Sequence, residues 1–140
     1  MEKEILFKGK RIDNGEWVYG AYLPLEGNEG RIATSCLEGD DENLLTVCAY
    51  PVDVETVCQY TGIEDKNGIR IFVDDICKYY NSYDGNGMGI IGEDTVEWVS
   101  GEICKNHDIT PLVYLKHSKE WEVIGNVNDN PELVYDVYND

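Results

Sequence analysis

The residues that come nearest to a catalytic pattern are an acid, Asp53, and the segment Glu64-Asp65-Lys66. Metal-dependent nucleases use an acid followed by a Glu-x-Lys because carboxylates hold Mg²⁺ beside a lysine that stabilises charge. Here the Glu-x-Lys runs directly into Asn67-Gly68, a dipeptide typical of tight turns in which charged residues face water. A chain of net charge −17 would also repel a phosphate-rich substrate. The sequence therefore predicts neither catalysis nor metal binding at these positions.

Other acidic clusters lack the spacing that a metal site or an acid–base pair requires. In the segment Asp84-x-Asn86-x-Met88-Gly89 a calcium loop would need an oxygen ligand at the fifth position, and its twelfth position is Thr95 instead of Glu. Asp74-Asp75 and Glu93-Asp94 are adjacent pairs, and adjacent residues of a strand point to opposite faces. We expect solvated turn residues at these positions and no metal.

The five cysteines indicate neither a disulfide framework nor a zinc site. Their number is odd, and no two of them have the Cys-x-x-Cys spacing. We expect reduced thiols that pack as small apolar side chains in strands, as is usual in a reducing cytosol. The positions are Cys36, Cys48, Cys58, Cys77 and Cys104.

Nucleophilic catalysis would require one of the two histidines, His107 and His117. Both lie in polar segments typical of loops or turns, and the sequence contains no Gly-x-Ser-x-Gly nucleophile elbow. The glycines between residues 85 and 89 are not followed by the Lys-Ser/Thr of a phosphate-binding loop. We therefore predict a protein that is not an enzyme, with no catalytic residue and no cofactor.

Composition sets further limits. Of 140 residues, 11 are basic, 28 are acidic and 42% are hydrophobic, which suffices for a packed core in one domain or two small halves. The acidic excess outweighs the short basic stretch Lys8-Gly9-Lys10-Arg11, so we expect no direct binding of nucleic acid. No signal-peptide pattern and no membrane-length apolar run is present, so we expect a cytoplasmic protein without membrane association.

Three Asn-Gly dipeptides predict the turns of a β-sheet. Asn14-Gly15 separates residues 6–12 from residues 16–23, where large side chains alternate, and predicts a hairpin. The alternating residues, expected on one face, are Trp17, Tyr19, Ala21 and Leu23. Asn67-Gly68 joins a strand ending near Tyr60 to one beginning at Ile69. The glycine-rich residues 82–89, which contain Asn86-Gly87, are expected to form a mobile loop.

Segments rich in β-branched and aromatic residues indicate further strands. They are residues 31–36, 44–48, 76–80, 95–99, 111–115 and 121–127, with an exposed acidic loop at residues 38–42. The only helix signal is Asn130-Pro131-Glu132-Leu133, which suits an N-cap followed by proline and predicts a short C-terminal helix. The sequence thus predicts a mainly β chain. We place an N-terminal β-hairpin region at residues 1–53, a C-terminal half at 54–134 and a tail at 135–140.

Three blocks, residues 10–20, residues 56–68 and residues 121–127 followed by 130–133, carry a family likeness. They include Asn14-Gly15-Glu16-Trp17, Gln59-Tyr60-Thr61-Gly62 and Trp121-Glu122-Val123-Ile124-Gly125-Asn126-Val127. In this order they resemble the YopX family of phage and prophage proteins. Three positions depart from the family pattern: Asp74-Asp75-Ile76-Cys77 replaces the usual Gly-Asp-Ile-Val, which changes two of them, and Cys58 stands where glycine is common. The resemblance implies a phage or prophage origin, a host-cytoplasm location and an SH3-like β-barrel in the C-terminal half. It implies no catalytic residues.

The sequence and the family resemblance leave three alternative functions of different classes. The first is a non-catalytic interaction module that acts on host or phage proteins in the cytoplasm. Its candidate contacts are Tyr79, Tyr80, Tyr83 and Trp98, wherever these are exposed rather than in the core. The second is an acidic nucleic-acid mimic that blocks a host DNA-binding protein, and the third is a metal-dependent nuclease or hydrolase. We favour the interaction module, with an unidentified protein partner. Exposed strand edges can pair between copies of the chain, so a homo-oligomer is a further alternative.

Overall fold

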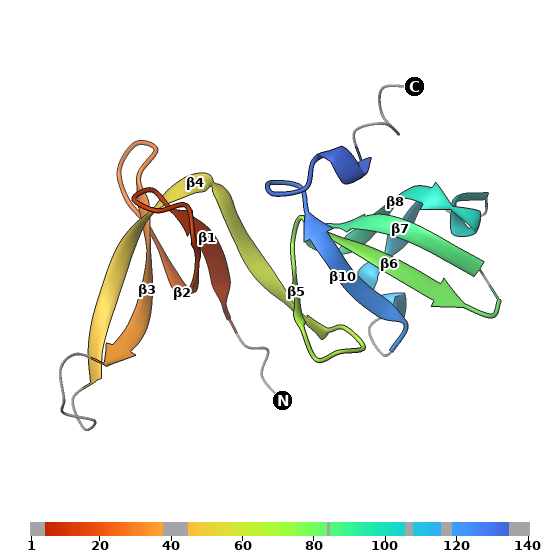
Figure 1. The fold of residues 1–140 in the computed structure, drawn as a ribbon, viewed down its shortest axis with the longest axis horizontal. Helices are drawn as coiled ribbons and strands as arrows, with labels where there is room; N and C mark the ends of the chain where they lie inside the picture. The colour runs from red at the N-terminus through yellow and green to blue at the C-terminus, as the bar shows by residue number, and fades with distance from the viewer. Residues whose placement is uncertain (1–4, 38–44, 84, 106–107, 116–118, 135–140) are drawn as a thin grey trace. The chain divides into compact units, whose positions relative to one another are not determined.

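The computed structural model describes residues 5–37, 45–83, 85–105, 108–115 and 119–134. The chain divides into two compact units, Met1–Tyr60 and Thr61–Asp140. Figure 1 shows that strands make up most of both units, so the mainly β fold expected from the sequence is confirmed. The boundary expected at residues 51–53 lies inside β4 (Leu45–Glu64), a long strand that contributes residues to both units.

The N-terminal unit is a ring of antiparallel strands. It comprises β1 (Phe7–Arg11), β2 (Trp17–Pro24), β3 (Gly30–Leu37) and most of β4. Each strand pairs with the next, and β1 also pairs with β4, which closes the ring. Inside it, Val18, Ile32 and Val52 are buried and pack against partly buried neighbours. The hairpin region predicted for this half is therefore part of a closed arrangement.

The predicted hairpin at Asn14-Gly15 is confirmed. Gly15 has a φ of 73°, and its N–H donates to the carbonyl of Arg11 at 2.9 Å. The side-chain oxygen of Asn14 accepts a hydrogen bond from the N–H of Glu16 at 2.9 Å. Only glycine adopts a positive φ in this turn, because left-handed backbone is costly for residues with a Cβ.

The C-terminal unit contains a five-stranded sheet in the order β10-β6-β7-β8-β9. Its strands are β6 (Asp75–Asn81), β7 (Gly85–Ile91), β8 (Thr95–Gly101), β9 (Ile109–Pro111) and β10 (Trp121–Asn126). A short strand, β5 (Arg70–Phe72), pairs with β4. Four consecutive strands thus form a meander, and the last strand returns beside the first (Figure 1). This antiparallel sheet confirms the mainly β fold expected for this half.

Three aromatic rings form the centre of the C-terminal core. The ring centroids of Trp98 and Trp121 lie 5.8 Å apart with planes 4° from parallel, and Tyr79 lies 4.8 Å from Trp121. Trp121 is fully buried, and the indole N–H of Trp98 donates to the hydroxyl of Thr110 at 2.8 Å. Each aromatic pair contributes about 0.5–1.5 kcal/mol beyond the area it buries.

Two sequence predictions in this unit are wrong. Residues 85–89 of the glycine-rich segment do not form a loop, because Gly85–Ile91 is strand β7. A Cβ on Gly87 would overlap the side chain of Ile103, so the glycine allows Ile103 to pack directly against the backbone of β7. Residues 111–115 are not a strand either. The strand β9 ends at Pro111, and a 3-10 turn, η2 (Leu112–Leu115), follows and buries Leu112.

The sheet also buries apolar side chains on the face opposite the aromatic core, here called the outer face. Ile76, Val99 and Val134 are buried there, and Met88 packs against them. Val134 belongs to a helical turn at residues 132–134, which confirms the helix predicted after Asn130. The side-chain oxygen of Asn130 accepts from the N–H of Asn126 at 3.2 Å, so it closes the preceding loop. The predicted tail, residues 135–140, lies outside the described residues.

The cysteines differ from the expectation at one position. Cys58, Cys77 and Cys104 are free thiols, and the first two are buried. Cys48 is disulfide-bonded, so the prediction of reduced cysteines is wrong there. Spacing along the chain does not report which cysteines the fold brings together. The side chain of Cys36 lies outside the described residues.

Candidate functional site

A groove of about 520 Å³ lies on the outer face of the C-terminal sheet. Four side chains from neighbouring strands form a row across it. Glu122 of β10 is opposite Lys78 of β6, which is opposite Met88 of β7, which in turn is opposite Ser100 of β8. Directly opposite residues of paired strands share a face, so all four line the groove.

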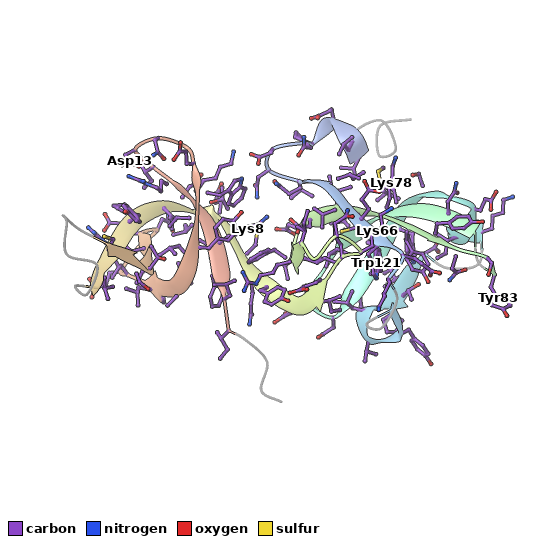
Figure 2. The ribbon with its side chains drawn as sticks, turned by 60° about the horizontal axis from the view of Figure 1, so that its bottom comes forward. Lys8, Asp13, Lys66, Lys78, Tyr83 and Trp121 are labelled. Atoms are coloured by element: carbon purple, nitrogen blue, oxygen red, sulfur yellow. The ribbon has the colours of Figure 1, made fainter. Side chains whose placement is uncertain are left out.

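Exposed tyrosines mark one end of the groove. Tyr80 lines it opposite Asn86, and 62% of Tyr80 is exposed. Tyr83 is 96% exposed and projects from the tip of the β6–β7 hairpin (Figure 2). Of the candidate contacts named from the sequence, Tyr80 and Tyr83 are therefore surface residues, whereas Tyr79 and Trp98 belong to the core.

Backbone forms part of the groove where two glycines face each other. Gly87 of β7 is paired with Gly101 of β8, and both line the groove. Gly101 has a φ of 104°, and a Cβ there would overlap the backbone of Gly87 and Asn86. Only glycine allows the two strands to approach in this way, so side chains are absent from this part of the surface.

A turn held by Asp65 supplies another wall of the groove. The Asp65 carboxylate is 6% exposed and accepts three backbone N–H groups. Its Oδ1 accepts from Asn67 at 2.8 Å and from Ile69 at 2.9 Å, and its Oδ2 accepts from Val123 of β10 at 3.0 Å. The carboxylate therefore orders the turn and ties it to β10.

The next residue, Lys66, is carried to the groove by this turn. Its N–H donates to the carbonyl of Trp121 at 3.0 Å, and its ammonium lies 3.3 Å from the carboxylate of Glu122. Lys66 and Lys78 both line the groove on the C-terminal unit (Figure 2). Because Lys66 and Glu122 are about half exposed, solvent screens the pair, and it positions the side chains more than it stabilises the fold.

Comparison with known proteins identifies the family. A family model described as YopX protein matches residues 6–135. The chain belongs to the YopX family. A solved structure, the crystal structure of protein EF1440 from Enterococcus faecalis, is similar with a TM-score of 0.53 and 18% sequence identity. The similarity covers 95% of this chain and 99% of that one. At that identity the likeness shows the fold alone. No curated protein matches the chain.

In this YopX-family chain the nuclease-like residues have other surroundings. Asp65 is held by backbone N–H groups, Lys66 lies beside Glu122, and Glu64 is exposed. Asp53 belongs to the N-terminal unit, where its carboxylate accepts the N–H of Glu55 at 3.1 Å. Within the described ranges, no three His, Cys, Asp or Glu side chains are arranged to hold a metal ion. No helix in those ranges is long and apolar enough to span a membrane.

The other acidic candidates also lie in turns or at strand starts. Asp75 is buried, and its Oδ2 accepts the N–H of Phe72 at 2.8 Å. Asp74 has a φ of 72°, which explains why the family pattern favours glycine at this position. Glu93 and Asp94 are exposed in the turn between β7 and β8. The remaining candidates, Asp84, His107 and His117, lie outside the described residues.

Basic side chains of the N-terminal unit contact aromatic rings of the same unit. The ammonium groups of Lys8 and Lys10 lie 4.6 and 5.5 Å from the ring centroid of Trp17. The guanidinium of Arg11 lies 4.1 Å from the ring centroid of Tyr50. Arg11 also pairs with Asp13 at 2.6 Å, and this hydrogen bond lowers the pKa of the Asp13 carboxyl. These cations therefore have partners within the unit (Figure 2 labels Lys8 and Asp13).

Sequence reasoning did not identify the groove residues Lys78, Met88 and Ser100. One local signal was present, because Lys78 and Tyr80 alternate with the buried residues Cys77 and Tyr79. That alternation indicates an outward face of β6, but it does not show which other strands lie beside it. The register that joins the three residues is set by long-range pairing.

Proposed function

We propose that this protein is a non-catalytic interaction module that binds a partner protein in the groove of its C-terminal unit. The groove itself is the observation that supports this. An exposed aromatic side chain, Tyr80, and a partly buried thioether, Met88, line it together with charged side chains and backbone. Aromatic residues and methionine are enriched in protein interfaces, usually with a polar rim around them.

The proposed partner is a host or phage protein of the bacterial cytoplasm. This part of the proposal rests on the resemblance to phage and prophage proteins. Disulfides are rare in a reducing cytosol, so the disulfide at Cys48 offers a test of location. In the cytoplasm this disulfide should be reduced, so protein from cells lysed in an alkylating agent should carry the label on Cys48. An unlabelled Cys48 would contradict that location.

Photo-cross-linking from the groove tests the interaction. A benzophenone amino acid replaces Asn86 or Ser100, which line the groove, and in the control it replaces Glu93, which is exposed in the β7–β8 turn. Each protein is irradiated in bacterial lysate. We expect a discrete adduct from Asn86 and Ser100 that weakens when Tyr80→Ala is added. Identical adducts from all three positions, or none from the groove positions, would contradict the proposal.

A nucleic-acid mimic is the second candidate, and the net charge of −17 is the observation that favours it. Mimicry requires rows of exposed carboxylates. Two carboxylates of the C-terminal unit, Asp65 and Asp75, are instead buried against backbone N–H groups. Replacing Tyr80 by alanine leaves the charge unchanged, so a partner bound by mimicry should tolerate that change.

A further inference from the structure

We propose that the segment which binds in the groove is extended and basic, with an arginine side chain between Tyr80 and Glu120. This inference rests on the proposed function, because it names the chemistry of the partner at the same groove. Three observations support it: the field of the whole chain, the carboxylates around the groove and the exposed tyrosine rings.

The first observation is the charge of the chain. With 28 acidic and 11 basic residues, the molecule attracts cations from a distance and repels anions. Such fields raise association rates of oppositely charged partners by about 10- to 1,000-fold at low salt. A basic segment therefore approaches this molecule faster than an acidic one of the same length.

The second observation is the arrangement of charges at the groove. Glu122 of β10 and Glu120, the residue before this strand, line it. Glu102 packs over Gly85, which is paired with Asn81 in the hairpin that carries Tyr80 and Tyr83. The groove also contains Lys66 and Lys78. Lys66 already contacts Glu122 at 3.3 Å, and Lys78 is opposite Glu122 on the neighbouring strand. An acidic segment would have to compete with Glu122 for these lysines.

The third observation is the exposed aromatic surface. Tyr80 lines the groove and Tyr83 stands beyond it on the hairpin, and both rings are mostly exposed. Guanidinium groups stack on aromatic faces, and the same molecule already contains such a contact between Arg11 and Tyr50. The planar guanidinium can also donate two parallel hydrogen bonds to a carboxylate such as that of Glu120.

The part of the groove formed by Gly87 and Gly101 leaves room for the main chain of the bound segment. An extended segment can lie against the backbone of these two residues, which lines the groove. Recognition of extended segments commonly combines main-chain contacts with pockets for alternate side chains.

Two peptides of opposite charge test the inference on the full chain. They are acetyl-Gly-Arg-Ala-Arg-Gly-amide and its counterpart with glutamate in place of arginine. Each is titrated into the ¹⁵N-labelled protein at 50 and 150 mM NaCl. We expect the basic peptide to shift the amide resonances of Tyr80, Asn86 and Ser100 in a saturable manner, with weaker binding at the higher salt.

Three variants separate recognition in the groove from general attraction. Tyr80→Ala should weaken binding of the basic peptide about two- to fivefold, as expected for an exposed cation–π contact. Glu120→Gln should weaken it up to about fivefold. Glu93→Gln changes the net charge equally but lies in the β7–β8 turn, so it should leave the affinity nearly unchanged.

Several outcomes would overturn the inference. Tighter binding of the acidic peptide at the same residues would reverse the partner class and leave the groove as a binding site. Equal effects of Glu93→Gln and Glu120→Gln would show attraction by the whole surface instead. Absence of shifts at the groove with the basic peptide would also overturn it, and the cross-linking experiment decides the proposed function separately.

Discussion

Replacing Asp65 by asparagine should remove one of the connections between the 65–69 turn and β10 while keeping the turn itself. Asparagine is nearly the same shape, and its oxygen can still accept the N–H groups of Asn67 and Ile69. The other carboxylate oxygen becomes an amide NH₂ that faces the N–H of Val123, so a donor meets a donor. The variant therefore removes one connection between the turn and β10.

The expected cost follows from three hydrogen bonds to a buried carboxylate. A hydrogen bond to a charged group contributes about 1.5–3 kcal/mol, and a neutral one about 0.5–1.5 kcal/mol. Losing the bond from Val123 and weakening the other two should together lower the free energy of unfolding by about 3.5–6 kcal/mol. A domain has only about 5–15 kcal/mol in total, so the effect is measurable.

Urea denaturation of a Trp17→Phe background would measure this cost. In that background the remaining tryptophans, Trp98 and Trp121, are both in the C-terminal core and report its unfolding. The matched control is Glu64→Gln, an exposed neighbour that should change stability by less than about 0.5 kcal/mol. If Asp65→Asn were as mild as Glu64→Gln, the role assigned to the buried carboxylate would be wrong.

Three further changes have expected outcomes. Asp74→Gly should raise the free energy of unfolding by about 0.5 kcal/mol, because it relieves a φ of 72°. Gly101→Ala should lower it by at least about 2 kcal/mol, since the added Cβ overlaps the backbone of Gly87. Both are measured by urea unfolding. Arg11→Gln should raise the pKa of the Asp13 carboxyl toward its ordinary value, which an NMR titration at acid pH would follow.

Each of these has a control within the chain. Asp75→Gly changes the neighbouring acid, which is buried and in a strand, and should destabilise the protein. Gly15→Ala also places a Cβ at a positive φ but meets open space, so it should cost only about 1–2 kcal/mol. Equal costs for Gly15→Ala and Gly101→Ala would contradict the packing argument. For Asp13, Glu16→Gln should shift the carboxyl pKa much less than Arg11→Gln does, because Arg11 supplies the hydrogen bond.

Much of the fold could be predicted because local chemistry determines it. Asn14-Gly15 predicts a tight turn whatever lies around it, and Asn130-Pro131 predicts a helix start in the same way. The alternation around Trp121 predicts β10, although a bulge after Val123 shifts the register, and Val127 packs with Ile124 on the outer face. Where the local preference of a segment agrees with its packing in the fold, the sequence alone predicts its secondary structure.

The wrong predictions occurred where packing between distant segments decides the structure. The glycines after residue 84 favour a loop by composition, but they lie in strand β7, where Gly87 and Gly89 pack against Trp98 and leave little space for a Cβ. The groove was missed for the same reason. Lys78, Met88 and Ser100 belong to three strands, and only the register between those strands makes them neighbours.

The facing pair Gly87 and Gly101 has a consequence for how binding preference can diverge among related proteins. A substitution at either position that reshaped the recess would push the strands apart and disturb Trp98 or Ile103 behind it. Substitutions that change the binding preference should therefore cost the least stability at Lys66, Lys78 and Tyr80, because these side chains can be exchanged without disturbing the core. Relatives should keep the bare backbone and differ in the residues around it.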